Sequence, residues 1–266
     1  MNASITIGQY IPGDSVLHRA DPRTKIILSI VFMVMTFLVN SFWTFAALTA
    51  FTLVVVLISG VPMKYTLRGL KPLLFIIIFT AVINIFTTSG TPISQTIPFK
   101  YITYEGIELA LKLAVRLALI IISGSLLTFT TTPILLTDGI EKLLNPLKKI
   151  GVPAHELAMM MSIALRFIPT LLEETDKIMK AQAARGADFD TGNLVQRAKS
   201  FIPVLVPLFV SAFRRADELA TAMEARCYRG GAGRTRMRQL KFTEADTKVF
   251  VTSVVVFAAL LLLEYL

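Results

Sequence analysis

Long apolar stretches separated by short polar breaks dominate the first half of the chain. They cover residues 26–39, 42–59, 72–86 and 106–130, and one further stretch covers residues 249–263. A membrane-spanning helix needs about 20 predominantly apolar residues, and with its flanking residues each stretch approaches that length. The pattern therefore predicts an all-α integral membrane protein with about five transmembrane helices.

The hydrophobic pattern changes between residues 133 and 248. Charged residues recur here, but the apolar positions keep a helical period. Pro133 and Pro153 favour helix starts, and Gly186 favours a helix end. We expect long helices that are too charged to cross a bilayer. The predicted regions are residues 1–132 with four spans, residues 133–248 with cytoplasmic or interfacial helices, and residues 249–266 with the last span.

Prolines lie within two of these predicted long helices. The first of the two runs to Arg185, and the next runs from about Leu194 to Arg226. Proline removes an intrahelical hydrogen bond and kinks a helix. Such kinks would let the helices leave the bilayer and run along its surface. The prolines expected to produce them are Pro169, Pro203 and Pro207.

Composition and charge agree with a membrane protein and predict its orientation. The chain is 54% hydrophobic and 17% charged, whereas soluble domains carry about 25% charged residues. Cytoplasmic loops are enriched in Lys and Arg, and 24 of the 27 such residues lie in the amino-terminal segment, the 61–71 loop or the 133–248 region. We therefore expect the amino terminus and the long helices on the cytoplasmic side of the cell membrane. The net charge of +9 indicates cytoplasmic loops and lipid rather than nucleic acid.

A short pattern occurs twice within the charged region. Residues 176–186 and 217–227 share Asp, an aliphatic residue, two alanines and an arginine at matching offsets. Each copy places an aliphatic residue, an alanine and the arginine on one helix face. Alanine lets a partner approach closely, and a guanidinium can bind a carboxylate through two hydrogen bonds. Two similar helix ends suggest two similar sites on a partner, although alanine-rich amphipathic helices are also common without such a role. The residues of these faces are Ile178, Ala181 and Arg185, and Leu219, Ala222 and Arg226.

No arrangement typical of catalysis or metal binding stands out. His155-Glu156 begins like a zinc-protease motif, but Met159 occupies the position of the second ligand. The glycine-rich residues 230–234 lack the Lys-Ser/Thr ending of a phosphate loop and favour a linker. We therefore expect neither a catalytic residue nor a bound cofactor or metal.

Two groups of basic residues have simpler interpretations. Lys112 and Arg116 lie in the fourth span, close enough to its outer end for their side chains to reach the interface. A basic segment before the last span favours anionic lipid over nucleic acid. Its residues are Arg229, Arg234, Arg236, Arg238 and Lys241.

Several segments together resemble one known family. The principal ones are Ala184-Arg185-Gly186 and Ala225-Arg226-Cys227. Others are Gly8-Gln9-Tyr10 to Arg19, Asp21-Pro22-Arg23-Thr24-Lys25, Arg166-Phe167-Ile168-Pro169 and Ile202 to Leu208. Over nearly its whole length the chain resembles the transmembrane coupling (T) components, EcfT, of energy-coupling factor (ECF) transporters. Cys227 stands where the first motif has Gly186, which is a departure between the copies.

The resemblance implies a non-catalytic subunit of a bacterial importer for vitamins or other micronutrients. Two ABC-type ATPases, expected as a heterodimer, would each receive one motif helix, and acidic residues in their grooves would pair with Arg185 and Arg226. ATP with Mg would bind to those ATPases and not to this chain. A small membrane protein, the substrate-binding S component, would rest on the long helices. Closure of the ATPases would tip it to release its vitamin inward.

Two other functions are weighed against this one. The permease of a conventional ABC importer usually presents one coupling helix per subunit, so two matched helix ends in one chain argue against it. An intramembrane enzyme would need paired catalytic Asp, His or Ser residues within its spans, and the predicted spans lack them.

Overall fold

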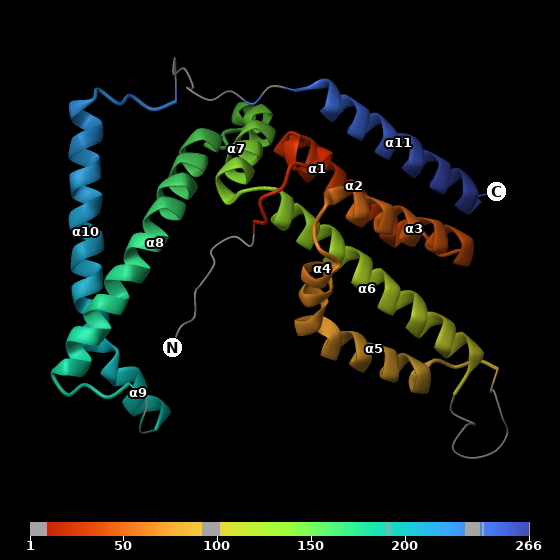
Figure 1. Ribbon diagram of the computed structural model, residues 1–266, viewed down its shortest axis with the longest axis horizontal. Coiled ribbons are helices and arrows are strands. Elements are labelled where there is room, and N and C mark those ends of the chain that lie inside the picture. Colours follow the sequence, from red (N-terminus) through yellow and green to blue (C-terminus); the bar gives the residue numbers. More distant parts are fainter. Residues whose placement is uncertain are drawn as a thin grey trace. The chain divides into compact units, whose positions relative to one another are not determined.

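The computed structural model describes residues 10–91, 102–189, 191, 193–231, 240 and 242–265. These residues form α-helices and short 3-10 helices joined by turns (Figure 1). Some residues named above lie outside the described ones, and they are Gly8, Gln9, Arg234, Arg236, Arg238 and Lys241. The chain divides into two compact units, Met1–Ile140 with Gln239–Leu266, and Glu141–Arg238.

The first unit contains most of the apolar helices. They are α1 (Val16–Arg19), α2 (Pro22–Leu38), α3 (Phe42–Ser59), α4 (Met63–Leu70), η1 (Lys71–Leu73), α5 (Leu74–Thr87), α6 (Tyr104–Thr130) and α11 (Glu244–Tyr265). α6 contacts α2, α3, α4 and α5, and α11 packs on α2 and α3. α6 is therefore the central helix of this unit. The buried apolar side chains that join α2, α3, α6 and α11 are Phe32, Met35, Leu48, Leu119, Phe257 and Leu260.

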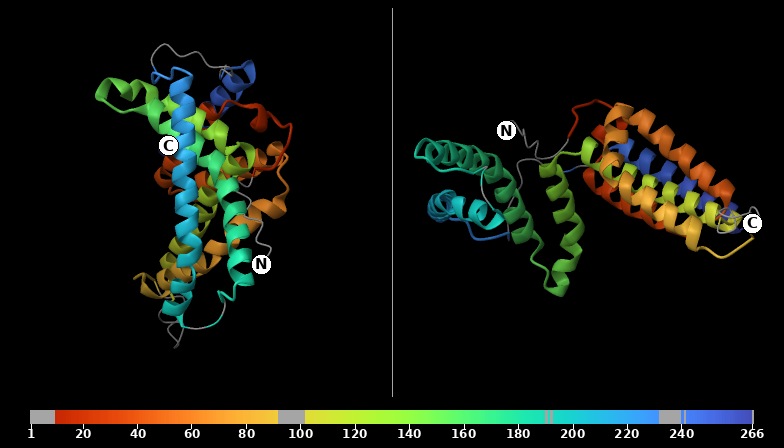
Figure 2. Two further views of the ribbon diagram at one scale, coloured as in Figure 1. Left: turned by 90° about the vertical axis from the view of Figure 1, so that its left-hand side faces the viewer. Right: turned by 90° about the horizontal axis from the view of Figure 1, so that it is seen from below.

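The second unit is built on two long helices. It contains η3 (Asn145–Ile150), α8 (Ala154–Ala184), α9 (Leu194–Ser200) and α10 (Ile202–Ala225), and the boundary between the units falls within α7 (Pro133–Leu144). α8 packs against α10, and α9 contacts α10. Figure 2 shows the long helices α8 and α10 from two further directions.

Five helices of the described part are long and apolar enough to cross a membrane, as predicted, but they are not the predicted five. They are Phe42–Ser59, Met63–Thr87, Tyr104–Thr130, Ala154–Ala184 and Glu244–Tyr265. α2 has only 17 residues, fewer than the roughly 20 that span a bilayer. α8 qualifies because its charged residues concentrate beyond residue 172, which leaves an apolar amino-terminal half. The sequence-based prediction missed α8 as a candidate span because it judged residues 133–248 by their overall charge.

The prolines differ in their positions within the helices. Pro169 lies inside α8 and Pro207 inside α10, as the sequence predicts. Pro203 does not lie inside a continuous helix, because α9 ends at Ser200 and α10 begins at Ile202. It occupies the first turn of α10, where its missing N–H would have no intrahelical partner. The expected kink at Pro203 is therefore a helix start.

The turn between α2 and α3 is held by a cation and an anion from other helices. Arg116 donates through Nε to the carbonyl of Thr36 at 3.0 Å and through Nη2 to that of Val39 at 2.8 Å. Glu264 accepts hydrogen bonds from the N–H groups of Asn40 and Ser41. Free carbonyls at a helix end favour a cation, and free N–H groups at a helix start favour an anion. Arg116 therefore caps α2 rather than only reaching the interface.

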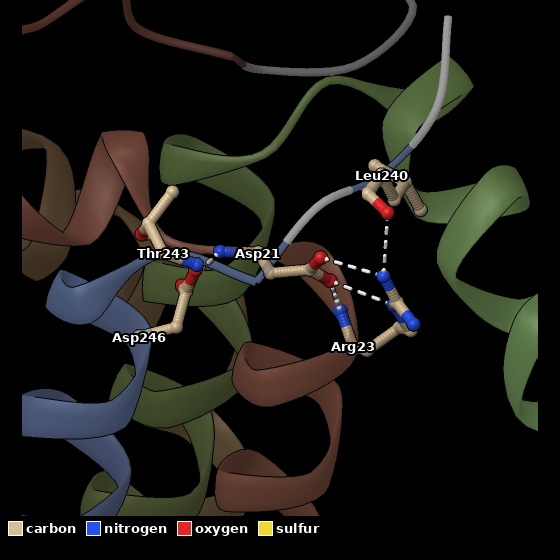
Figure 3. A network of polar contacts seen from close by, with 5 residues as sticks. All are labelled: Asp21, Arg23, Leu240, Thr243 and Asp246. Atoms are coloured by element: carbon tan, nitrogen blue, oxygen red, sulfur yellow. Dashed lines mark hydrogen bonds and ion pairs between the residues drawn. The ribbon is translucent and has the colours of Figure 1, made fainter.

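A buried polar network joins the start of α2 to the start of α11 (Figure 3). Asp246 is 2% exposed. Its carboxylate accepts hydrogen bonds from the N–H of Asp21 and from the N–H and hydroxyl of Thr243. Arg23 binds the Asp21 carboxylate through Nε and Nη2, and Nη2 also donates to the carbonyl of Leu240 at 3.1 Å. The network fixes the segment before the last helix against the first long helix.

Candidate functional site

The first arginine motif forms a capped helix end. Arg185 follows the last residue of α8, and Gly186 adopts a left-handed conformation with φ of 91°. The N–H of Gly186 donates to the carbonyl of Ala183 at 3.0 Å, and that of Ala187 donates to the carbonyl of Gln182 at 3.0 Å. This pair of bonds is a Schellman motif, which satisfies carbonyls that the helix end would leave free. The cap fixes the direction of the chain at the arginine.

The second motif ends α10 with the same hydrogen bonds. Arg226 follows the last helical residue, and Cys227 has a φ of 56°. The N–H of Cys227 donates to the carbonyl of Glu224 at 2.8 Å, and that of Tyr228 donates to the carbonyl of Met223 at 3.0 Å. Cys227 is the non-glycine residue with positive φ in the described part of the chain. The departure from glycine in sequence therefore leaves the backbone conformation unchanged.

Substitutions at Gly186 and Cys227, the two residues with positive φ in the motifs, should change the free energy of unfolding by different amounts. A side chain at positive φ costs roughly 1 kcal/mol, and no atom lies within 4 Å of a Cβ built on Gly186, so the backbone conformation decides the cost. We expect Gly186→Ala to lower the free energy of unfolding by about 1 kcal/mol. Cys227→Gly relieves the strain but loosens the unfolded chain, so it should stay within about 0.5 kcal/mol of the wild type. Thermal unfolding in detergent, followed by circular dichroism, measures both. Equal stability of Gly186→Ala and the parent chain would contradict this account.

Both motifs are accessible to a partner. The side chains of Arg185 and Arg226 are exposed, and neither forms an ion pair with a residue that the structure describes. Ala184, Gly186, Ala225 and Cys227 are exposed as well. On the predicted faces the aliphatic residues are half-buried and the alanines are exposed, with Ile178 and Leu219 in the first group and Ala181 and Ala222 in the second. Each helix end thus presents a free guanidinium beside small residues.

The two motifs lie at opposite ends of an antiparallel helix pair. Glu174 of α8 accepts a hydrogen bond from Arg215 of α10 at 2.7 Å. Near the end of α8, Gln182 contacts the carbonyl of Pro203 at the start of α10. The first motif therefore lies near the start of α10, and the second at its end (Figure 1). The 24 residues of α10 extend roughly 36 Å at 1.5 Å per residue, which sets the separation of the motifs.

Sequence reasoning missed the ion pair that holds the two helices together. Glu174 and Arg215 are 41 residues apart, and each resembles an ordinary surface charge within its own helix. The repeat offset of the motifs is also 41 residues, so the two partners occupy equivalent positions, two residues before each copy, and carry opposite charges. Among the described residues no group of three or more His, Cys, Asp or Glu residues could hold a metal ion.

The geometry defines a class of protein, a multi-pass all-α membrane protein with two exposed arginine-tipped helix ends. The family described as CbiQ, cobalt transport protein, matches residues 13–237. The chain is 63% identical over 265 residues to the energy-coupling factor transporter transmembrane protein EcfT of Ruminiclostridium cellulolyticum, which covers 100% of this chain and 99% of the relative.

Other relatives carry the same name. The protein of Thermosediminibacter oceani is 59% identical over 249 residues, which are 94% of each chain. That of Bacillus subtilis is 52% identical over 261 residues, which are 98% of each chain. This chain therefore belongs to the CbiQ family, and its relatives there are bacterial EcfT proteins. The resemblance seen in the sequence is confirmed.

Proposed function

We propose that this chain is the energy-coupling membrane subunit of an ECF-type importer. It passes the ATP-driven motion of two ATPase subunits to a substrate-binding S component that takes up a vitamin or another micronutrient. The names of the relatives support a transporter role. The observation that carries the proposal is the pair of exposed arginines, Arg185 and Arg226, on helix ends with the same capping bonds.

Two ATPase subunits fit this arrangement better than one. The motifs are separated by roughly the length of α10, about 36 Å, so a single groove does not receive both. Each guanidinium pairs with a carboxylate in its own groove, and charge-assisted pairs of this kind contribute about 1.5–3 kcal/mol. The ATPases form a heterodimer, and ATP with Mg binds to them. This chain binds no cofactor and catalyses no reaction.

An apolar surface on α10 supports the contact with the S component. The amino-terminal half of this helix exposes several large apolar side chains, and they are Leu205, Val206, Phe209, Val210 and Phe213. Exposed apolar patches of this kind mark protein or membrane contacts. The S component rests on this surface in the plane of the bilayer. The amino terminus and the arginine tips face the cytoplasm, which the distribution of Lys and Arg supports.

Identification of every chain that co-purifies tests the proposal. The full chain, tagged and extracted from cell membranes in mild detergent, should carry two ATPase subunits and at least one small membrane protein. If no small membrane protein accompanies it, the permease of a conventional ABC importer becomes the better interpretation. Enzymatic turnover by the purified chain alone would favour a membrane enzyme instead.

A further inference from the structure

The imidazole of His155 lies between a carboxylate and a phenol. Its Nδ1 is 3.2 Å from Oε1 of Glu141, and its Nε2 is 3.2 Å from the hydroxyl of Tyr228. The side chains of His155 and Glu141 are 20% and 15% exposed. Glu141 belongs to the last turn of α7, His155 to the first turn of α8, and Tyr228 follows the second arginine motif by two residues. Three separate segments of the second unit thus meet at one ring.

The backbone after the second motif is shaped to fit this ring. Gly230 turns the chain with a φ of 84°. A Cβ built on Gly231 would lie 2.6 Å from Cδ2 of His155, closer than a side chain can approach without displacing the ring. Residues 228–231 therefore fold over the start of α8. Figure 1 shows α8 and α10 farther apart here than at the opposite end of the pair, so this segment bridges the gap between them.

The chain after the first motif makes different contacts. Ala187 occupies the position that corresponds to Tyr228, and its methyl group cannot form a hydrogen bond. The loop that follows is held by Phe189, whose ring lies 5.3 Å from that of Phe201 and whose carbonyl accepts a hydrogen bond from Nε of Arg197 at 3.4 Å. These contacts tie the first loop to α9 and the start of α10, whereas the contacts of His155 tie the second tip to the end of α7 and the start of α8. The two arginine tips are therefore anchored by different chemistry.

We propose that His155 is a positioning residue for the second arginine tip. Through its contact with Tyr228, His155 holds Arg226 in a fixed position relative to the start of α8. Glu141 orients the imidazole for that contact. We call Glu141, His155 and Tyr228 the His155 clamp. Motion applied at Arg226 then passes through His155 to the start of α8, whereas motion applied at Arg185 enters α8 at its other end. The coupling consequence rests on the proposed function, but the clamp itself is a property of this chain alone.

The single cysteine provides a probe at the clamp. Cys227 is exposed and adjacent to Tyr228, so a nitroxide attached there in the full chain, in lipid nanodiscs, reports the mobility of the second tip by electron paramagnetic resonance. Tyr228→Phe and His155→Ala should shorten the rotational correlation time of the label several-fold. In His155→Gln the amide lies near the position of Nε2 and should restore the slow motion. In His155→Asn the amide lies near that of Nδ1 and should not.

A label on the first tip is the matched control. The double substitution Gly186→Cys with Cys227→Gly exchanges the two left-handed residues and moves the only thiol to the other motif. Removing the clamp should leave that label unchanged. If both labels become mobile together, His155 supports the helix pair in general and the proposal fails. If neither label changes, the clamp does not hold the tip and the proposal also fails.

A transport assay tests the coupling consequence of the proposal. In the unlabelled complex reconstituted in vesicles, Tyr228→Phe should leave ATPase attachment intact. It should lower the substrate taken up per ATP hydrolysed by about fivefold, the factor that loss of one ordinary hydrogen bond gives. Unchanged uptake per ATP with a mobile label would overturn the positioning role and leave the proposed function standing. If the wild-type chain binds no ATPase, the proposed function fails, and the label experiment still decides whether the clamp exists.

Discussion

Reversal of both motif charges, Arg185→Glu with Arg226→Glu, is expected to abolish ATPase attachment and transport. Both guanidinium groups are exposed and unpaired among the described residues, so the substitutions leave the internal contacts of α8 and α10 intact. Each lost pair removes about 1.5–3 kcal/mol, and the new carboxylates repel the acidic grooves. A total of about 3–6 kcal/mol corresponds to a loss of affinity by roughly 10²–10⁴.

Affinity purification of the tagged variant with both ATPases present measures this loss. Arg214→Glu is the matched control, because Arg214 is an exposed arginine of α10 outside both motifs and undergoes the same change of charge. The control should retain both ATPases and transport activity. Recovery of both ATPases with the double variant, in the amounts seen with the control, would refute the pairing. The single variants should differ in severity if the ATPases are distinct chains, and equal effects would indicate a homodimer.

The capped helix ends could be predicted because their signals are local. Glycine after an alanine-rich helix marks a left-handed cap, and the repeat places Cys227 in register with Gly186. The bonds from Ala187 and Tyr228 then follow from backbone geometry. Cysteine alone carries no such signal, so the conformation at Cys227 could be inferred only through its alignment with the first copy.

The partners of individual charged side chains could not be predicted. Arg116 binds carbonyls of Thr36 and Val39, which lie 80 and 77 residues away, and a backbone carbonyl leaves no mark in the sequence. His155 meets Tyr228 across 73 residues. The break between α9 and α10 was missed for a related reason. Pro203 suits either a kink or a helix start, and the local sequence does not decide between them.

Asp246 is the clearest case of a residue whose place depends on distant contacts. It lies in the charged segment before the last apolar stretch, where the sequence suggests solvent or interface. In the structure it is buried, and its carboxylate accepts a hydrogen bond from the N–H of Asp21, 225 residues away. It also accepts hydrogen bonds from the N–H and the hydroxyl of Thr243, and the bond from the N–H is one half of a capping box at the start of α11. A short-range pattern at 243–246 indicates the cap but not the contact with the first long helix.

Replacement of Asp246 by alanine is expected to lower the free energy of unfolding by about 3 kcal/mol. The substitution leaves the buried N–H of Asp21 without its acceptor, which costs about 1–3 kcal/mol. It also removes the hydrogen bonds from the exposed Thr243 that cap α11, and loss of a cap costs about 1 kcal/mol. The start of α11 is then no longer fixed to the start of α2. Thermal unfolding in detergent should therefore show a lower Tm, with α11 the first helix to lose protection in hydrogen exchange.

Two variants separate this effect from a general loss of charge. Glu244→Ala removes a carboxylate from the same first turn, but Glu244 is exposed, so its effect should stay within about 0.5 kcal/mol. Asp246→Asn keeps one oxygen as an acceptor and replaces the other with an NH2 group that faces other donors. Its stability should therefore fall between that of Asp246→Ala and that of Glu244→Ala. If Asp246→Ala were as stable as Glu244→Ala, the network would contribute nothing to the position of the last helix. Since α11 packs on both α2 and α3, its apolar contacts alone would then have to hold it there.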